Sequence, residues 1–486
     1  MTQTQALAIL KTGANVFLTG EPGAGKTHTI NEYAAYLRAR DIEPAVTAST
    51  GIAATHLGGM TIHSWSGIGI KNKLDKRDLH NIATNKYITK RVQPAKVLII
   101  DEVSMLAPGT LEMVDAVCRV IKQNQAPFGG LQVIFVGDFF QLPPIIKKDY
   151  NENEQSEFFT EQVSRFAFDS PAWERAKPVV CYLTEQYRQD DNVFLNILSA
   201  IRRNIFGDNH LRHLAARKVE QHLAPEDAPK LFSHNVNVDS VNEAMLEKLP
   251  SQRHTFKSTS DGHHALVAVL QKGCLSPETL CLKIGAAVMF TKNNQREGFV
   301  NGTLGEVLGF DKESGLPIVR TRGGMKIEVE KMSWTIEENG EVRAQITQLP
   351  LRLAWAITVH KSQGMSLDEA VMDLSQVFEF GQGYVALSRV RRLSGLHLLG
   401  WNDRAFQVHP EVLAKDESFR LASQEAEALF AKISPVEMEQ KHKNFISSIG
   451  GKEAGVRPTY FKAVKKKKKK AKKKKTAWGG WGGYGR

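Results

Sequence analysis

The sequence lacks the features of a membrane or secreted protein. None of its apolar runs approaches the roughly 20 residues that a membrane-spanning helix needs. Its first residues, MTQTQALAILKTG, lack the basic start and apolar core of a signal peptide. The four cysteines form no C-x-x-C pair, and Cys274 and Cys281 are too far apart for a zinc knuckle. We therefore expect a cytoplasmic protein with free thiols and no membrane partner.

The body of the chain also has little net charge. The 486 residues carry a formal charge of +12, but ten lysines lie in the run 465–475. Without that run the rest of the chain is left with +2, so a nucleic-acid track on the body must be local. From residue 450 onward the composition is typical of a disordered tail, in which the lysine run is followed by Trp478, Trp481 and Tyr484 among glycines.

Short apolar runs alternate with segments of helical period in the first part of the chain. The runs predict buried strands at 15–20, 44–48, 97–101 and 132–138. The helical spacing predicts helices at 26–38, 51–58 and 111–122. Because strands that alternate with helices imply a parallel sheet with crossover connections, we predict an α/β nucleotide-binding domain over residues 1–184.

A second alternation follows, interrupted by a segment of different texture. Its predicted elements are a helix at 238–249 and strands at 230–233, 353–358, 370–374 and 396–400. Between them, at 284–349, short β-like runs are separated by Asn-Gly, Ser-Gly and Gly-Gly turns. This pattern predicts a second α/β domain (185–283 and 350–405) with a small β-barrel inserted at 284–349. A helical segment (406–449) and the tail (450–486) complete the chain.

The segment GEPGAGKT at 20–27 matches the phosphate-binding loop pattern G-x-x-x-x-G-K-[ST] without a mismatch. It lies between a predicted strand and a predicted helix, where backbone N–H groups can face phosphates. We expect Lys26 to reach the β- and γ-phosphates and the Thr27 hydroxyl to bind Mg²⁺, so ATP and Mg²⁺ are the predicted cofactors. The loop residues predicted to bind nucleotide are Gly20, Gly23, Ala24, Gly25, Lys26, Thr27 and His28.

Polar residues follow two later strands. Asp101 and Glu102 end the apolar run 97–101. We predict that Asp101 serves the metal and that Glu102 orients or deprotonates the attacking water; the phosphate loop earlier in the chain favours this over a simple helix cap. Gln141 is placed to sense the γ-phosphate. Asp138, three residues earlier, fits a site residue and a turn residue equally well.

Seven motifs occur in a fixed order along the chain. They are GEPGAGKT (20–27), TASTGIAATHLGGMTIHSW (47–65), DEVS (101–104), PFGGLQVIFVGDFFQLPP (127–144), TEQYRQ (184–189), AWAITVHKSQGMSLDEAVMDL (354–374) and GYVALSRVRR (383–392). Over about residues 3–400 this set resembles the PIF (petite integration frequency) branch of superfamily-one DNA helicases. The resemblance implies two RecA-like parallel-sheet motor domains, with a small wedge at about 66–92 in the first and the β-barrel in the second.

The resemblance also implies a function and roles for particular residues. It implies ATP- and Mg²⁺-dependent unwinding with 5′-to-3′ movement, on single-stranded DNA and on forked or structured DNA. Arg188 and Arg389 resemble arginine fingers, and Gly364 lies beside the γ-phosphate. Gln3 has the spacing of an adenine-reading glutamine, with Gln5 as a rival. The implied DNA contacts are Thr50, Gly51, His63, Thr358, His360, Lys361 and Ser362.

Several alternatives stay open at this stage. Trp65 fits a DNA contact and the core of the wedge equally well, and a lone histidine is more often structural. The tail can tether DNA, dock a protein partner or only aid solubility. Besides a helicase, the motifs fit an ATP-driven translocase or remodeller without strand separation, a RecD-like recombination helicase, or a nucleic-acid tether switched by ATP. We expect a monomer in solution; the biological pathway is not specified, because several pathways use the same motor.

Overall fold

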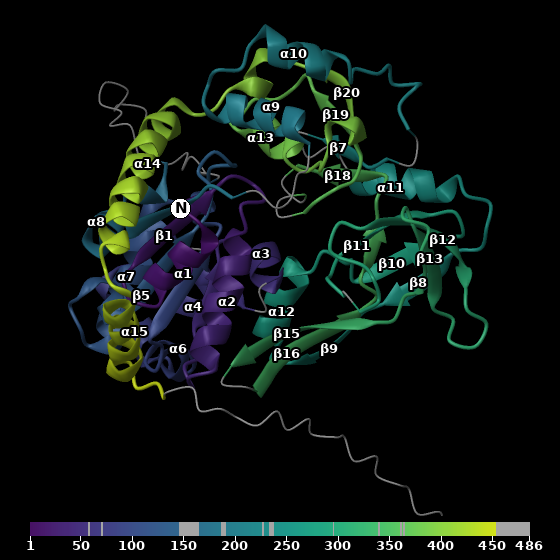
Figure 1. Ribbon diagram of the computed structural model, residues 1–486. Helices are drawn as coiled ribbons and strands as arrows, with labels where there is room; N and C mark the ends of the chain where they lie inside the picture. The colour runs from purple at the N-terminus through teal and green to yellow at the C-terminus, as the bar shows by residue number, and fades with distance from the viewer. Residues whose placement is uncertain are drawn as a thin grey trace, which may run out of the picture.

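The computed structural model describes residues 1–56, 59–69, 71–144, 165–185, 191–225, 228–232, 238–294, 296–338, 341–359, 362 and 365–452. These residues form two parallel sheets with helices and a separate region of antiparallel strands (Figure 1). Among them, no helix combines the length and the apolar character that crossing a bilayer requires. The two parallel sheets bear out the predicted α/β class.

The first sheet has the strand order β3-β2-β4-β5-β1-β6, and all its neighbouring strands run parallel. Strands β1 and β5 are buried along their whole length, as expected where helices cover both faces of a parallel sheet. We call this sheet and its helices the six-stranded unit. Its strands are β1 (Val16–Gly20), β2 (Ala45–Ala48), β3 (Met60–Thr61), β4 (Val97–Asp101), β5 (Gln132–Val136) and β6 (Val179–Leu183). Its helices are α1 (Gln3–Leu10), α2 (Lys26–Arg38), α3 (Gly51–His56), α4 (Ile62–Ser66), α5 (Lys76–Thr84), α6 (Lys86–Val92), α7 (Pro108–Lys122) and α8 (Pro171–Ala176).

The second sheet has the order β18-β7-β19-β20 and is also parallel. We call it, with its helices, the four-stranded unit. Its strands are β7 (Lys230–Phe232), β18 (Ala356–Thr358), β19 (Ala370–Leu374) and β20 (Leu396–Trp401). Its helices are α9 (Asn192–Arg202), α10 (Asp208–Ala215), α11 (Val238–Glu247) and α13 (Gln382–Leu387).

The prediction of one strand over 353–358 is wrong. The structure has two strands there, β17 (Leu351–Leu353) and β18. β17 pairs with β11 (Ala287–Phe290) of the antiparallel region, whereas β18 pairs with β7 of the four-stranded unit. The chain must therefore change sheets between them, and a continuous apolar run does not reveal such a change because both strands are buried.

The antiparallel region contains sheets of five, three and two strands among the described residues. The five-stranded sheet comprises β14 (Lys326–Glu328), β13 (Pro317–Thr321), β12 (Leu304–Phe310), β11 and β17. The others pair β15 (Met332–Glu338), β16 (Glu341–Gln348) and β9 (Thr259–Gly262), and β10 (Thr279–Leu282) with β8 (His254–Lys257). Helix α12 (His264–Gly273) lies beside α3 (Figure 1). The division into domains, with a β-barrel inserted at 284–349, stays a prediction. Strands β8 and β9 of the antiparallel region lie before residue 284, outside the range predicted for the barrel.

Two C-terminal helices, α14 (Pro410–Ala431) and α15 (Pro435–Ser448), pack against the six-stranded unit (Figure 1). α14 covers the edge strand β6, where the backbone N–H of Tyr182 donates to Ser423 Oγ at 3.0 Å. Covering an edge in this way hides hydrogen-bonding groups that could otherwise pair with another chain. α15 reaches α1, since His442 Nε2 lies 2.9 Å from the carbonyl oxygen of Ala8.

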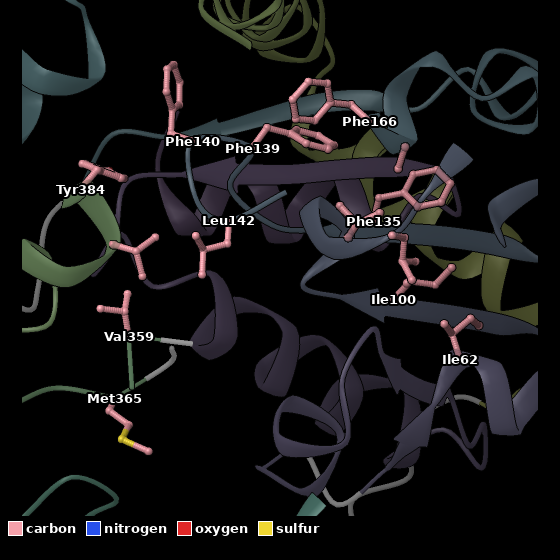
Figure 2. Packing of buried hydrophobic residues seen from close by; sticks show 14 of the residues in the cluster. Ile62, Ile100, Phe135, Phe139, Phe140, Leu142, Phe166, Val359, Met365 and Tyr384 are labelled. Atoms are coloured by element: carbon pink, nitrogen blue, oxygen red, sulfur yellow. The ribbon is translucent and has the colours of Figure 1, made fainter. Parts of the chain in front are cut away.

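One hydrophobic cluster extends through both units. It includes Phe135 and Ile100 of the six-stranded unit and Val359 and Tyr384 of the four-stranded unit (Figure 2). Burying such side chains contributes about 1.5–3 kcal/mol each. The two sheets therefore share a core at their junction, and the predicted site residues lie around it.

Candidate active site

The phosphate-binding loop connects β1 to α2. Gly25, the N-cap of α2, has φ 85°, a left-handed conformation that glycine adopts without strain. A Cβ at Gly25 would overlap the side-chain amide of Gln3, so any larger residue there would displace that amide from its place against the loop. Lys26 Nζ donates to the carbonyl oxygens of Gly20 at 2.7 Å and Glu21 at 3.1 Å. Its ammonium group is thus held at the loop.

The remaining loop residues differ in exposure. Ala24 is buried, Gly23 is half-buried, and Thr27 and His28 are exposed at the start of α2. The Thr27 hydroxyl is therefore accessible to a ligand from solvent. His28 Nε2 lies 3.5 Å from Glu32 Oε1, one helical turn further along.

The structure separates the two candidate adenine-reading glutamines. Gln3 Nε2 donates to the carbonyl oxygen of Ala24 at 3.1 Å, and the Gln3 N–H donates to Glu185 Oε2 at 2.7 Å. Gln5 instead completes the capping box of α1 with Thr2, and its Nε2 donates to Glu427 at 2.9 Å. Gln3 therefore lies against the phosphate loop, whereas Gln5 has a structural role.

Asp101 and Glu102 lie at the carboxyl end of β4. Burial raises the pKa of the Asp101 carboxyl, while the Glu102 N–H, which donates to Asp101 Oδ1 at 2.9 Å, and the charge of Lys26 act in the opposite direction. Burial also raises the pKa of Glu102, and the neighbouring Asp101 charge raises it further. Glu102 has φ 52°, a strained conformation for a non-glycine residue that is common at functional sites. These carboxyl groups form a half-buried acidic pair, and the charge of the phosphate-loop lysine acts on both.

Gln141 and Asp138 lie in the turn after β5. Gln141 is 7% exposed, and its N–H donates to the carbonyl oxygen of Asp138 at 3.0 Å. Asp138 Oδ1 accepts a hydrogen bond from the N–H of Phe140 at 3.2 Å. The same oxygen forms an ion pair with Arg202 Nη1 at 2.7 Å. Asp138 is thus both a turn residue and one partner of a buried ion pair.

Arg389 comes from the four-stranded unit, just after α13. Its side chain is 1% exposed; Nε donates to the Val385 carbonyl oxygen at 2.9 Å, and Nη2 donates to Ser388 Oγ at 2.8 Å. The charge of Arg389 acts to lower the pKa of Glu102, as does that of Lys26. Groups of both units therefore act on one carboxyl group. Arg188 and Gly364 lie outside the described residues.

The predicted DNA contacts lie just beyond the carboxyl ends of strands in both units. Thr50 follows β2, and its Oγ1 accepts from the N–H of Ala53 at the start of α3, whose first residue is Gly51. Thr358 ends β18, and Ser362 Oγ donates to the Val359 carbonyl oxygen at 2.7 Å. His360 and Lys361 lie outside the described residues.

The remaining predicted contacts lie on α4. Burial lowers the pKa of His63, so its imidazole is more readily neutral than usual. Trp65 is 4% exposed within the main hydrophobic cluster, and Arg91 Nε donates to its carbonyl oxygen at 2.8 Å. Trp65 is therefore a core residue, one of the two alternatives that the sequence left open.

Sequence reasoning missed residues that support the site. Glu185 holds the N–H of Gln3, and Arg202 pairs with Asp138. Neither stood out, because a single glutamate and an arginine at a helix end carry no local pattern. Glu185 lies inside the TEQYRQ motif, which was the only available signal for it.

Comparison with known proteins identifies the family. The chain is 42% identical to the ATP-dependent DNA helicase Pif1 of Psychrobacter sp., over 93% of this chain and 75% of that protein. The chain belongs to the PIF1-like helicase family. The family description "PIF1-like helicase" matches residues 2–201, and "DNA helicase Pif1, 2B domain" matches residues 266–310. Human ATP-dependent DNA helicase PIF1 is 37% identical over 84% of this chain and 61% of its own length.

Solved PIF1 structures have the same fold. Unliganded Pif1 from Bacteroides sp. matches with a TM-score of 0.73 at 29% identity, over 86% of this chain and 96% of that one. The Bacteroides complex with ADP-AlF4 matches with 0.71, and the single-stranded-DNA complex with 0.56, over the same shares. The predicted resemblance and fold class are thus confirmed, and this PIF1-like helicase is an ATP-dependent DNA helicase, as predicted.

Proposed function

We propose that this helicase hydrolyses ATP between its two units and uses the resulting opening and closing to move 5′-to-3′ along single-stranded DNA. The observation that carries the proposal is that the two units meet at the phosphate loop, where Ser199 Oγ of α9 donates to Glu21 Oε1 at 3.4 Å. In addition, the charges of Lys26 and Arg389, one from each unit, both act to lower the pKa of Glu102. A γ-phosphate beside Glu102 would thus meet cations from both sides. Phosphoryl transfer gains most of its rate from such positioning and charge stabilisation.

Each site residue has a role within this proposal. Lys26 binds the β- and γ-phosphates, and Glu102 orients the attacking water and takes its proton. Gln141 senses the γ-phosphate, while Arg389 stabilises charge that develops on the equatorial oxygens. Gln3 reads the adenine, supported by its contact with the phosphate loop at Ala24. Arg188 and Gly364 keep their predicted roles as second arginine and phosphate neighbour.

The residues present fit a magnesium ion. Thr27 offers an exposed hydroxyl, and Asp101 offers a carboxylate at the carboxyl end of β4. Mg²⁺ favours one or two protein oxygens together with substrate phosphates and water. When bound, the ion would neutralise charge on the β- and γ-phosphates. It would also offset the unfavourable burial that raises the pKa of Asp101.

DNA is gripped at two places in this proposal. Thr50, Gly51 and His63 provide the grip of the six-stranded unit; Thr358, Ser362, His360 and Lys361 provide that of the four-stranded unit. Hydroxyl and backbone groups can hold phosphates without a large positive charge, which agrees with the nearly neutral body. Closure on ATP shortens the distance between the grips, and opening after hydrolysis lengthens it, so the strand advances.

Forked duplexes with one single-stranded tail test the polarity and the coupling to unwinding. We expect strand separation with a 5′ tail and none with a 3′ tail, in the presence of ATP and Mg²⁺. Glu102→Gln is the control, because it leaves the phosphate loop intact while removing the base. Unwinding from the 3′ tail alone would refute the polarity. DNA-stimulated hydrolysis without separation on either fork would favour the translocase alternative.

We further propose that the tail raises DNA affinity by tethering and that the protein acts as a cytoplasmic monomer. The four cysteines are free, which supports a reducing compartment. Deleting residues 461–486 is expected to weaken single-stranded DNA binding mainly at low salt. The slope of log affinity against log salt should become shallower by about 0.7 for each phosphate that the tail neutralises in the full chain. Fluorescence anisotropy of labelled single-stranded DNA over a salt series measures this slope for both chains. An unchanged slope would exclude the tail from DNA binding.

A further inference from the structure

Helix α9 carries polar side chains from the four-stranded unit to the nucleotide site. At its N-terminus, Asp191 accepts hydrogen bonds from the N–H of Phe194 at 3.1 Å and of Leu393 at 2.9 Å. One turn before its end, Ser199 Oγ donates to Glu21 Oε1 of the phosphate loop at 3.4 Å. The side chain of its last residue, Arg202, contacts Asp138 of the six-stranded unit. The N-terminus of α9 is thus anchored within the four-stranded unit, and its last turn contacts the six-stranded unit at the nucleotide site.

The guanidinium of Arg202 is shared among several acceptors. Nη1 donates to Asp138 Oδ1 at 2.7 Å and to the Tyr384 hydroxyl at 3.2 Å. Nε and Nη2 donate to the Tyr182 hydroxyl at 3.1 and 2.8 Å, and the guanidinium carbon lies 4.2 Å from the centre of the Phe140 ring. With 1% exposure, this charge is almost fully removed from water.

These partners come from both units. Asp138 and Phe140 belong to the turn that also carries Gln141, whereas Tyr384 lies on α13, which leads directly to Arg389. A buried guanidinium is costly unless it is neutralised and its donors are satisfied, which Asp138 and the tyrosines do here. The planar fork of arginine donates from three nitrogen atoms spread over the guanidinium, whereas lysine donates from one compact ammonium group that cannot span the same partners. Arg202 thus connects the predicted phosphate sensor to the helix of the predicted arginine finger.

We propose that Arg202 is a positioning residue that keeps the Gln141 turn and the Arg389 helix in register as the two units close. Tyr384 is its partner on α13. This inference rests on the proposed function and adds to it a residue that belongs neither to the phosphate loop nor to the DNA grips. A purely structural Arg202 would stabilise the junction without affecting the chemistry.

Kinetics of Arg202→Lys and Tyr384→Phe, in the full chain, separate the two roles. We expect DNA-stimulated kcat to fall about tenfold for Arg202→Lys and about threefold for Tyr384→Phe, with the KM for ATP within about twofold. Arg202→Lys keeps the positive charge opposite Asp138 but loses the guanidinium that bonds Asp138 and Tyr384 together. Tyr384→Phe removes only the hydroxyl that accepts from Arg202 and leaves the packing of the ring nearly unchanged. Affinity for ADP with aluminium fluoride should fall with kcat, because this mimic of the transition state requires the same register.

Two matched variants serve as controls. Arg203→Lys changes the exposed neighbour of Arg202. Tyr33→Phe removes a buried hydroxyl that donates to Gln132 Oε1 at 2.7 Å, away from the junction. Both should keep the wild-type kcat. If Tyr33→Phe lowers kcat as much as Tyr384→Phe, the effect reflects lost stability, and the inference is overturned.

The remaining outcomes are equally decisive. Unchanged kcat in folded Arg202→Lys and Tyr384→Phe overturns the inference, whatever happens to their melting temperatures. If Arg202→Lys does not fold, Tyr384→Phe alone decides, because its core is nearly intact. A wild-type chain without DNA-stimulated hydrolysis overturns the proposed function and the inference together. An active wild type with unchanged variants overturns the inference alone.

Discussion

Replacing Lys26 by alanine is expected to lower ATP hydrolysis by about a thousandfold or more, because the loop loses the cation that we propose binds the β- and γ-phosphates. The structure adds a second cause. The charge of Lys26 opposes the rise in pKa of both Asp101 and Glu102. Without it, both carboxyl groups hold their protons up to higher pH, so fewer molecules carry the ionised forms that serve the metal and the water.

Phosphate release, with and without single-stranded DNA, measures this loss. The control is Lys11→Ala, which removes a lysine of the same unit whose Nζ lies 4.7 Å from the centre of the Tyr36 ring. Lys11→Ala should retain hydrolysis, and its melting temperature shows what losing a partly buried lysine costs. Hydrolysis near the wild-type rate in Lys26→Ala would refute the assignment of the nucleotide site.

Replacing Arg389 by alanine is expected to lower DNA-stimulated kcat by about a thousandfold, as for other arginine fingers, while ATP binding changes little. The two measurements separate because Lys26 and the rest of the loop lie on the six-stranded unit, whereas Arg389 lies on the other. In the proposed cycle Arg389 reaches the phosphate only when the units close, so we expect it to stabilise the transition state more than the bound substrate.

The buried position of Arg389 calls for a second variant. Its removal empties a buried volume and takes one of two donors from the Val385 carbonyl oxygen, which keeps the Ser388 hydroxyl, so Arg389→Ala can also lose stability. Arg389→Lys retains the charge and should recover part of kcat. Arg391→Ala, which removes an exposed arginine 3.3 Å from Asp368, should behave as wild type. Nucleotide affinity falling as far as kcat in Arg389→Ala would contradict an arginine that acts only on closure.

Features that depend on neighbouring residues were predictable from the sequence. The loop from Gly20 to Thr27 needs glycines, a lysine and a hydroxyl at fixed spacing, and the structure has it between β1 and α2 as predicted. Strand β4 coincides with the predicted run 97–101. Such features depend on local backbone geometry and on the alternation of buried elements, which a sequence displays directly.

Pairings between distant residues could not be predicted in this way. Gln3 and Gln5 have the same side chain two positions apart, and only the fold places the first against Ala24. Only Ala354 and Trp355 separate β17 from β18, yet the two strands pair with different sheets. For Gln5 a local signal exists, since Thr2 and Gln5 have the spacing of a capping box. The change of sheet has none, because burial gives the same apolar composition in either sheet.

The sequence by itself determined an ATP-driven PIF1-like motor, because its phosphate loop and ordered motifs are local patterns of residue type and spacing. Only the tertiary structure decided which charges act together. Arg202 is 64 residues from Asp138 and 182 from Tyr384, and the fold alone brings the three into one buried network. Burial at the junction then strengthens their interactions and raises the pKa of Glu102, since electrostatic effects depend on distance and surroundings that no sequence motif encodes.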